Sequence, residues 1–406
     1  MTDPRSADAL PGDQATPLSP ARPAESTPRA NQPEPGAGTE HWIPSDAAEA
    51  TPSLDHGPTA DAAEPEGTSG AAGPSDAMPA PRPGRRRRRW VGVLVWASIA
   101  PFAAWAALRL IPADVHFQWI RAVAFTPYVA LASAALPLLA LLARRWAALV
   151  VSLAVATTLA ACVLPRAVPA GAPAAAGPRL RVLSANLKMG TVPPEKVVAL
   201  IRELRPDVLT LQELTPSAAA GLRAAGIGTL LPYGVDVSEP GAHGSGIYSR
   251  HPVAPGRHIR FGDFRQGVAT VRVPGAPEVA VVSVHPCAPR YAERAPCWAE
   301  GLAALPLPAP GGPVRILAGD FNATLDHARM RRLLDAGYRD AAAMTGNGLA
   351  ATWPYEPWHF NGWSIPPVTL DHILAAPGVA TRSFGVHPLP RTDHRAVFAE
   401  LTLPAR

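Results

Sequence analysis

The chain has 406 residues, of which 48% are hydrophobic and 17% charged, with a formal net charge of +5. That length exceeds one typical domain, and the charge is segregated: residues 1–89 hold 9 Arg against 13 Asp and Glu, whereas residues 178–406 hold 23 basic against 18 acidic residues. The C-terminal segment is only mildly basic and has no Lys/Arg block, so it permits nucleic acid as a partner without requiring it.

Residues 1–89 are rich in Pro, Ala, Gly, Asp, Glu and Thr and contain almost no aromatic or β-branched apolar residues. Such a segment cannot bury enough apolar surface to offset the entropy lost on ordering, and we expect a disordered tail. The tail ends in a run of five arginines, Arg85–Arg89.

Three apolar runs follow, at residues 90–111, 122–143 and 146–164. Each has close to the roughly 20 residues that cross the hydrocarbon core of a bilayer, which predicts three transmembrane helices with membrane lipid around them. A cleaved signal peptide is the alternative for the first run, but the long upstream tail and the two later runs argue against it.

The arginines predict the orientation of these spans. Arg85–Arg89 precede the first span, and Arg144 and Arg145 lie in the short link between the second and third. Basic flanks of this kind face the cytoplasm. The tail is then cytoplasmic, and everything beyond residue 164 lies outside the cell membrane. Residues 165–177, rich in Ala, Pro and Gly, are expected to link the spans to one domain at 178–406.

Two cysteines lie in this outer domain, at Cys287 and Cys297. Disulfides persist outside the cytoplasm, and we expect a bridge between the two, with two buried thiols as the alternative. Cys162 lies in the third apolar run and is expected to be inert.

Polar residues end or open several strand-like apolar runs in the outer domain. Amphipathic helical stretches intervene, notably residues 193–206, which predicts an α/β fold with polar groups gathered at one end of the sheets. The polar residues are Asn186 in "LRVLSANL", Glu213 in "DVLTLQE", His285 in "VAVVSVH", Asp320 and Asn322 in "VRILAGDFN", Asp371 in "VTLDHILAA", and Asp393 and His394 in "TDHRAVFAEL".

The stretch around Gly319 illustrates the pattern. Side chains alternate in an extended strand, so Asp320 and Asn322 are expected on one side and Phe321 on the other. Gly319 permits the close approach of backbone or of a ligand. A plain turn after a strand is the alternative for this motif.

In this order and at these spacings, the motifs resemble the endonuclease/exonuclease/phosphatase superfamily. The stretches that carry the resemblance are "ANL", "LQE", "GSGIYSR", "SVHP", "GDFNAT", "TLDHIL" and "TDHR", between Arg181 and Glu400. The resemblance implies a four-layer αββα sandwich of two mixed β-sheets, with the active site at one edge of the sheets. It also implies Mg²⁺-dependent hydrolysis of phosphate esters, with Mn²⁺ as a substitute.

The resemblance and the preference of Mg²⁺ for hard oxygen ligands together suggest the metal contacts. Glu213 is the expected ligand, and a buried structural Glu is its alternative. Asn186 is expected to hold the metal site or a phosphate oxygen, and Asp393 to take a metal or water contact. Several nucleases of the superfamily carry an acid two positions after the first Asn, where this chain has Lys188, so a second metal contact is not expected there.

The catalytic roles follow in the same way. His394 is expected to be the general base or a phosphate-polarising group, with Asp371 orienting its imidazole. His285 is expected to donate to the phosphoryl oxygen or the leaving group. Asp320 would position or activate the attacking water, and Asn322 would hydrogen-bond charge that develops in the transition state.

An aromatic stretch precedes Asp371. Its rings suit stacking on bases or insertion at the bilayer interface, and ordinary packing of a Pro-rich loop is the alternative. The rings are those of Trp353, Tyr355, Trp358, Phe360 and Trp363.

These features predict a membrane-anchored, Mg²⁺-dependent hydrolase of phosphate ester bonds, first of all a phosphodiesterase or nuclease acting outside the cytoplasm. A lipid head-group phosphodiesterase or a phosphomonoesterase is the second hypothesis. A catalytically inactive receptor or adaptor that keeps the fold is the third, although none of the matched acid, amide and imidazole positions is lost. The sequence implies no particular protein partner.

Overall fold

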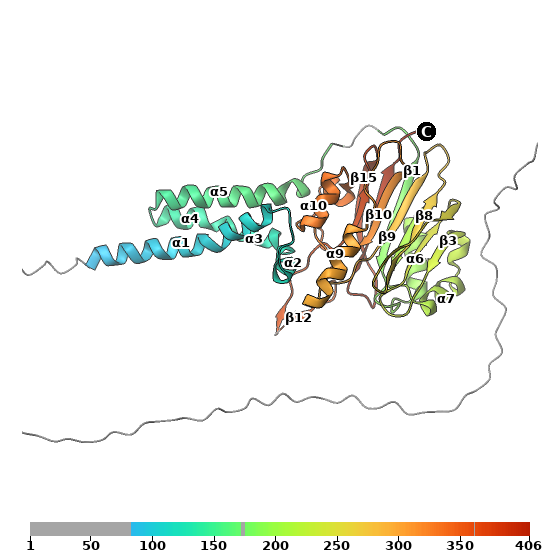
Figure 1. Ribbon diagram of the computed structural model, residues 1–406, viewed down its shortest axis with the longest axis horizontal. Helices are drawn as coiled ribbons and strands as arrows, with labels where there is room; N and C mark the ends of the chain where they lie inside the picture. Colours follow the sequence, from blue (N-terminus) through green and yellow to red (C-terminus); the bar gives the residue numbers. More distant parts are fainter. Residues whose placement is uncertain (1–82, 172–174, 361) are drawn as a thin grey trace, which may run out of the picture. The chain divides into compact units, whose positions relative to one another are not determined.

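The computed structural model of the chain describes residues 83–171, 175–360 and 362–406 (Figure 1). Residues 1–82 of the expected disordered tail lie outside the described residues. Helix α1 (Pro83–Leu110) begins before the predicted boundary at residue 89 and includes the arginine run in its first turns.

Helices α1 and α5 (Trp146–Val163) are each long and apolar enough to cross a membrane. Between them, α2 (Phe117–Val123) and the helices α3 (Thr126–Ser133) and α4 (Ala135–Leu142) pass the same test together, but the chain bends by 65° after α2. Pro127 lies in the first turn of α3, where its missing N–H is tolerated although it cannot extend α2. The predicted second span, 122–143, is therefore broken near its start.

These helices pack on one another through an apolar cluster that includes Val95 and Ile99 of α1, Leu136 and Ala140 of α4, and Ala148 of α5. The Arg145 guanidinium also donates to the backbone carbonyl of Arg88. The start of α1 and the α4–α5 link therefore lie at the same end of the helical segment.

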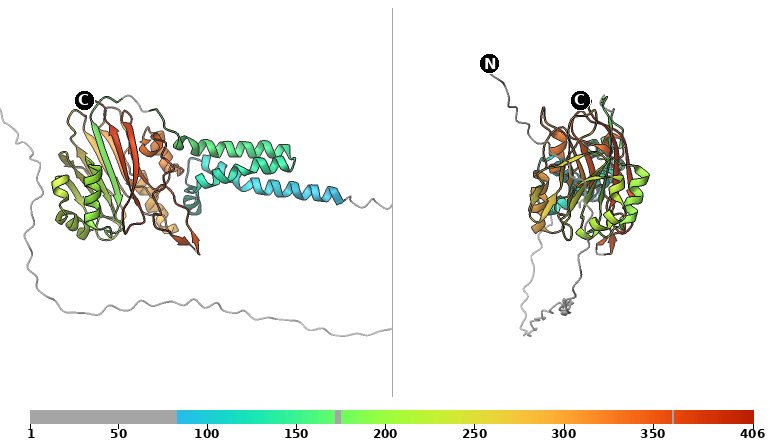
Figure 2. Two further views of the ribbon diagram at one scale, coloured as in Figure 1. Left: turned by 180° about the vertical axis from the view of Figure 1, so that it is seen from behind. Right: turned by 90° about the vertical axis from the view of Figure 1, so that its right-hand side faces the viewer.

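Two six-stranded sheets form the centre of the domain at residues 178–406 (Figure 2). The first has the order β15-β16-β1-β2-β4-β3 and the second β11-β14-β10-β9-β8-β5. Strands β1 and β2 are parallel, as are β9 and β10, and the other neighbours are antiparallel, so both sheets are mixed. The first sheet comprises β1 (Arg179–Asn186), β2 (Val208–Gln212), β3 (Tyr233–Val237), β4 (Ser245–Ser249), β15 (Ala380–Pro388) and β16 (Arg395–Thr402). The second comprises β5 (Val253–Pro255), β8 (Val268–Val271), β9 (Val279–Val284), β10 (Val314–Asp320), β11 (Arg339–Asp340) and β14 (Asp371–Ala375).

Alternation along the strands builds the core. In β1, Leu180 and Val182 belong to the buried cluster between the sheets, whereas Leu183 belongs to the cluster under the helices. In β10, Ile316 faces the other sheet and Leu317 faces the helices. This period of two is what places one apolar set on each face of a strand.

Helices cover the outer face of each sheet, on opposite sides of the pair in the right-hand view of Figure 2. Helices α6 (Pro194–Leu204), α7 (Pro216–Ala224) and α8 (Ile227–Leu230) pack on the first sheet. Helices α9 (Ala295–Ala303) and α10 (Ala328–Asp335) pack on the second. The layers are helix, sheet, sheet and helix, and the predicted αββα sandwich is confirmed.

The remaining elements are short. They are η1 (Leu164–Ala167), the ribbon of β6 (Ile259–Phe261) and β7 (Phe264–Gln266), η2 (Ala292–Arg294), α11 (Ala341–Met344), and the ribbon of β12 (His359–Phe360) and β13 (Trp363–Ser364). Strands β1, β2, β9 and β10 end at the edge where β14 and β16 begin, and this edge carries the site described next.

Candidate active site

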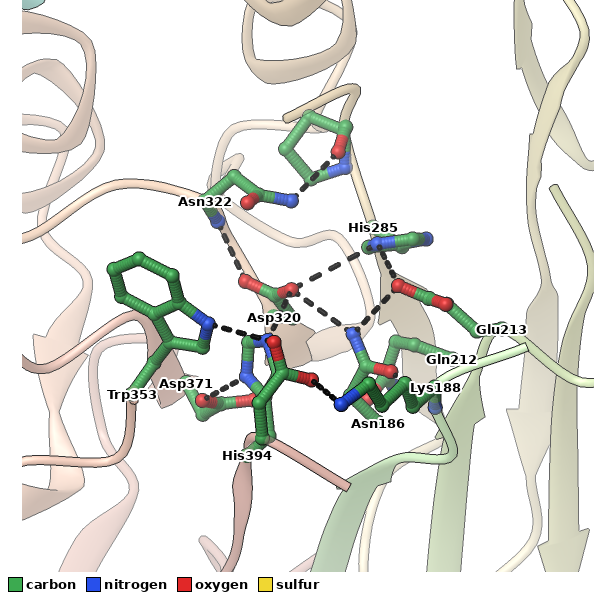
Figure 3. A network of polar contacts seen from close by, with 12 residues as sticks. Asn186, Lys188, Gln212, Glu213, His285, Asp320, Asn322, Trp353, Asp371 and His394 are labelled. Carbon is green, nitrogen blue, oxygen red and sulfur yellow. Dashed lines mark hydrogen bonds and ion pairs between the residues drawn. The ribbon is translucent and has the colours of Figure 1, made fainter. Parts of the chain in front are cut away.

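The predicted polar residues meet at one edge of the sandwich (Figure 3). The alternation that builds the core also aims several of them, because Asn186 continues the inward series of Leu180 and Val182. Asp320 continues the series of Ile316 and Ala318 in the same way. The site is thus the polar end of the space between the sheets.

A polar layer separates this site from the apolar core. The Ser184 hydroxyl donates to Gln212 Oε1 at 3.3 Å, and Gln212 Nε2 donates to the Ser283 hydroxyl at 3.0 Å. All three side chains are buried and point between the sheets. Because buried polar groups are costly unless they are hydrogen-bonded, these bonds support a rigid floor under the site.

Asp320 lies at the centre of the site and is 1% exposed. Its Oδ2 accepts from Asn186 Nδ2 at 3.1 Å and lies 3.7 Å from His285 Nε2 and 3.6 Å from His394 Nε2. Its Oδ1 accepts from the Asn322 backbone N–H at 2.8 Å. Burial raises the pKa of Asp320, and the nearby Asp371 carboxylate raises it as well, against the opposing effect of the two histidines.

The backbone before Asp320 requires glycine. A Cβ on Gly319 would collide with the carbonyl oxygen of Val284 on β9, the strand that pairs with β10 in parallel. The close approach that Gly319 permits is therefore that of a neighbouring strand. This packing fixes Asp320 opposite Asp371, its register partner on β14.

Asn186 connects two carboxylates. Its Nδ2 donates to Glu213 Oε1 at 3.2 Å as well as to Asp320, while its Oδ1 accepts from the Lys188 backbone N–H at 2.9 Å. Glu213 Oε2 accepts from the Met189 backbone N–H at 2.7 Å. Glu213 has a φ of 54°, a left-handed conformation that turns the chain directly after β2. The Asn186 amide thus orients Glu213 and Asp320 with its N–H bonds.

His394 and Asp371 form the predicted pair. His394 Nδ1 lies 2.9 Å from Asp371 Oδ2, so Nδ1–H donates to the carboxylate and Nε2 is directed toward Asp320. Burial lowers the pKa of His394, but the charges of Asp371 and Asp320 outweigh burial and raise it to about 10. The two carboxylates thus favour the protonated form of the His394 imidazole.

His285, the residue directly after β9, faces the same centre. Its Nε2 lies 3.6 Å from Glu213 Oε1 and 3.7 Å from Asp320 Oδ2. Its backbone N–H donates to Gln266 Oε1 at 3.0 Å, and its ring packs edge-on against Phe264. The buried Nδ1 atom has no hydrogen-bond partner within the described ranges. The imidazole is held by packing and keeps a free nitrogen.

Asn322 is placed differently from the alternation expected for "GDFN". Extended backbone ends at Asp320, and Asn322 has a φ of 47°. Its Nδ2 donates to the Pro286 carbonyl at 3.0 Å, and its own carbonyl accepts from Trp298 Nε1 at 3.0 Å. One of its two side-chain N–H bonds is thereby used for holding the loop after His285.

The cysteine pair lies beside this loop. The structure joins Cys287 to Cys297 in a disulfide that links the residue after Pro286 to helix α9. Cys287 is fully buried. The bridge therefore fixes the segment whose Pro286 carbonyl holds Asn322.

Asp393 is tied to residues at the rim of the site. Its Oδ2 accepts from Trp353 Nε1 at 3.1 Å, and its Oδ1 lies 3.7 Å from Lys188 Nζ. Both carboxylate oxygens thus have protein partners. Lys188, the departure from the nuclease pattern, is an ion-pair partner of Asp393.

The donor set fits a hard divalent cation. Glu213, Asp320 and Asp371 bring three carboxylates into one site, and none pairs with a Lys or Arg within the part of the chain that the structure describes. One ligand atom each from Asp320, Asp371 and His394 lie within 4.8 Å of one another. The oxygens of Glu213 and Asp320 each accept one hydrogen bond from the chain, and a carboxylate oxygen that accepts one hydrogen bond still has a lone pair for a cation.

Sequence reasoning missed several supporting residues. Gln266 holds the His285 backbone, Thr352 Oγ1 accepts from the Asp371 backbone N–H at 3.1 Å, and Thr392 Oγ1 accepts from the His394 backbone N–H at 3.2 Å. Thr392 directly precedes "DHR", and Thr at such a position is a residue type that often accepts a hydrogen bond from a backbone N–H two residues later, which is the signal that could have found it. Gln266 ends the short strand β7 and Thr352 lies in a loop, and neither has a sequence signal of its own.

The family model described as "Endonuclease/Exonuclease/phosphatase family" matches residues 183–394. No curated protein matches the chain. Among solved structures, an endonuclease/exonuclease/phosphatase from Beutenbergia cavernae is 20% identical over 56% of this chain and 72% of its own, with a TM-score of 0.43.

Two further solved structures are similar at the same level. A Neisseria 3′ phosphatase, NExo, bound to a product DNA hairpin is 21% identical over 54% of this chain and 98% of its own, with a TM-score of 0.42. D. rerio TDP2 complexed with a single-strand DNA product is 18% identical over 55% of this chain and 98% of its own, with a TM-score of 0.43. The family match covers about half of the 406 residues, from β1 to His394, and includes every residue assigned to the site. The chain therefore belongs to the endonuclease/exonuclease/phosphatase family.

Proposed function

We propose that this phosphoester-hydrolysing enzyme is a membrane-anchored, divalent-metal-dependent phosphodiesterase that acts outside the cytoplasm, with nucleic acid as its first substrate class. The observation that carries the proposal is the convergence on Asp320 of an amide and two imidazoles, from Asn186, His285 and His394, with Glu213 beside them. These are the groups that phosphate ester hydrolysis needs, and they come from strand ends of both sheets.

The cation would be held by Glu213, with Asn186 fixing the orientation of that carboxylate. Mg²⁺ is the proposed ion, and Mn²⁺ would substitute for it. When bound, a divalent ion neutralises phosphoryl oxygens and stabilises the leaving alkoxide. Asp393 was expected to take a metal or water contact, but its partners Trp353 and Lys188 favour a role in shaping the rim.

Asp320 is the proposed proton acceptor for the attacking water. Its buried position and raised pKa favour the uptake of a proton, and the Asn186 and Asn322 N–H groups hold its two oxygens in place. His394, protonated and anchored by Asp371, would direct its Nε2–H at a phosphoryl oxygen. The raised pKa favours this polarising role over that of a general base. His285 would donate to the leaving oxygen.

A lipid head group is the second candidate substrate, favoured by one observation. The Tyr128 hydroxyl, near the start of α3, donates to the Pro367 carbonyl at 2.7 Å. This contact ties the aromatic stretch 353–368 to the apolar helices, and Trp363 in that stretch is 80% exposed. Exposed tryptophans beside a membrane-spanning helix suit the interfacial layer where lipid phosphates lie.

The catalytic proposal is tested with the full chain purified into lipid nanodiscs. Turnover of a chromogenic phosphodiester, single- and double-stranded DNA, RNA and phospholipid vesicles is measured with Mg²⁺, with Mn²⁺ and with EDTA. Asp320→Asn and His394→Gln are expected to abolish metal-dependent turnover, whereas Asp236→Asn, which removes an exposed ion pair with Arg223, leaves it unchanged. Turnover that survives both site variants would show that the activity comes from elsewhere.

The orientation is tested separately. A reporter fused after Arg406 is expected to be active only outside the cytoplasm. A reporter that works only in the cytosol would contradict the proposed topology but would leave the catalytic proposal intact.

A further inference from the structure

A buried carboxylate in the catalytic domain is hydrogen-bonded by two arginines that precede this domain in the sequence. Asp326 is 0% exposed, in the loop between Asp320 and helix α10. Its Oδ1 accepts from Arg109 Nε at 2.8 Å and from Arg166 at 2.6 Å, and its Oδ2 accepts from the same Arg166 at 2.8 Å. Arg109 ends α1 and Arg166 lies in η1 after α5, both outside residues 178–406.

The two arginines are themselves buried, at 6% and 8% exposure. Burial opposes ionisation of Asp326, but the charges and hydrogen bonds of Arg166 and Arg109 outweigh it and hold the pKa of Asp326 below its usual range. Within the described ranges these are the only ion-pair partners of Asp326. A buried ion left without its partner is strongly destabilising, so the catalytic domain depends on the membrane segment for this charge.

A second contact comes from the loop after α1. The N-cap residue of α10, His327, makes no side-chain cap for its own helix. Instead the Asp114 carboxylate accepts from the backbone N–H groups of Ala328 at 2.9 Å and Arg329 at 3.1 Å. A carboxylate at this position satisfies otherwise free N–H groups and interacts favourably with the helix dipole. Asp114 is the sole acidic residue between residues 90 and 177.

His327 makes a third contact. Its Nδ1 accepts from the Thr324 backbone N–H at 2.9 Å, so its Nε2 carries the proton and donates to the carbonyl of Ile120 in α2 at 2.8 Å. Ile120 also packs with Phe321 and Trp298 in the core under the second sheet. The loop after β10 is thereby held by polar and apolar contacts from α2.

The same loop carries the active site at its other end. Asp320 opens it, Asn322 follows two residues later, and Asp326 closes it before α10. The carbonyl of Asn322 is fixed by Trp298, which packs edge-on against the His327 ring. A displacement of the loop at Asp326 would therefore also displace Asp320 and Asn322.

We infer that the membrane segment is a positioning part of the active site, because Arg109, Arg166 and Asp114 fix the loop that carries Asp320 and Asn322. The inference rests on the proposed function for its catalytic consequence. None of the three residues touches the reacting atoms, and each acts through Asp326 or the start of α10. The start of the expected linker is docked as well, since the Arg166 carbonyl accepts from the Gly348 N–H at 3.0 Å.

The test uses the full chain in nanodiscs and compares Asp326→Asn with the exposed control Asp236→Asn. Both changes remove one acid from an ion pair with Arg, but only the first pair is buried. Asp326→Asn is expected to lower kcat on a soluble phosphodiester by roughly 10²-fold, the effect of a small misplacement of catalytic groups, with KM nearly unchanged. A loss of global stability alone would lower the amount of active protein. It would not speed hydrogen exchange selectively at the backbone amides of residues 321–331.

Three further measurements test the inference independently of Asp326→Asn. Asp114→Ala, at a half-buried position, is expected to lower kcat in the same direction and to speed hydrogen exchange at Ala328 and Arg329. The triple variant Arg109→Met, Arg166→Met and Asp326→Leu replaces the whole ion cluster by apolar side chains and is expected to recover most of the kcat lost in Asp326→Asn. Hydrogen exchange across residues 321–331 is recorded for each variant.

The outcomes separate the inference from the proposed function. The inference would be overturned if Asp326→Asn and Asp114→Ala both showed the same kcat and the same hydrogen-exchange rates as the control Asp236→Asn. If Asp326→Asn does not fold, Asp114→Ala and the triple variant decide by the same readouts. A wild-type chain without turnover would sink the proposed function, and the exchange rates of residues 321–331 would then decide whether the membrane segment fixes the loop.

Discussion

His394 is the residue whose charge state most depends on its neighbours. It lies between Asp371 at 2.9 Å and Asp320 at 3.6 Å, which together raise its pKa to about 10 despite burial. The proposed role of His394 requires the protonated form. Activity is therefore expected to hold through neutral pH and to fall as the pH rises toward that pKa.

Asp371→Asn tests this dependence. Loss of the carboxylate removes the largest of the charges that raise the pKa, so the pKa of His394 falls and the imidazole loses its proton at lower pH. The alkaline limb of the kcat/KM profile is expected to move to lower pH, with a loss of roughly 10²-fold or more above neutrality. An alkaline limb in the same place as that of the wild type would contradict the role given to Asp371.

Gly319 shows how one backbone position fixes the acid beside it. Gly319→Ala places a Cβ against the carbonyl of Val284 on β9, and a strand cannot move aside as a flexible side chain would. The change is expected to cost about 1–3 kcal/mol of unfolding free energy. It should also lower kcat by displacing Asp320. Denaturant unfolding and steady-state kinetics measure both effects.

Gly228→Ala is the matched control for this substitution. Gly228 lies in α8, and a Cβ there meets nothing within 4 Å. This variant is expected to keep wild-type stability and activity. Equal stability of the two variants would show that the β9–β10 approach does not constrain the site.

At the scale of elements, the strands and most of the site could be predicted because both depend on local pattern. The alternation in β1 and β10 buries one apolar set on each face, and the polar residues Asn186 and Asp320 continue the inward set. The order of the motifs then indicated a known family. What the strand pattern could not predict is where regular backbone stops, and Asn322 turned toward Pro286 for that reason.

The hydropathy pattern also could not predict the bend after α2. Hydropathy averages over about 20 residues and reads 122–143 as one span, whereas the chain turns by 65° between α2 and α3. The hydrogen bond between His327 and the Ile120 carbonyl explains the direction of α2, because it holds α2 against the catalytic domain. It joins residues 207 positions apart, which no local pattern contains.

At the scale of the whole molecule, the aromatic stretch connects the apolar helices with the site. Tyr128 holds Pro367 at one end of the stretch, and Trp353 holds Asp393 at the other. Trp363 lies between them, exposed on the β12–β13 ribbon. If lipid is a substrate, this ribbon is where the enzyme meets the head-group layer.

Trp363→Ala is expected to reduce turnover of a phospholipid in vesicles by about 10-fold, because full burial of an aromatic side chain contributes about 1.5–3 kcal/mol. Turnover of a soluble phosphodiester should not change, since Trp363 is 80% exposed and supports no core. Trp363→Phe, which keeps an apolar ring, should retain most of the activity on vesicles. Equal losses on both substrates would argue against a membrane contact by this residue.

The buried ion cluster also affects the distribution of positive charge along the apolar helices. Arg109 and Arg166 stand at the ends of α1 and α5 that were assigned to the exterior, where cationic residues oppose the rule for membrane topology. Asp326 is hydrogen-bonded to both, so the buried cluster of two arginines and one aspartate carries a net charge of +1 rather than +2. Arg86–Arg89 and Arg144, near the opposite end of the helical segment, are exposed, as is Arg121 in α2. In the proposed topology, the ends of α1 and α5 on the exterior side therefore carry less net positive charge than a count of their arginines alone gives.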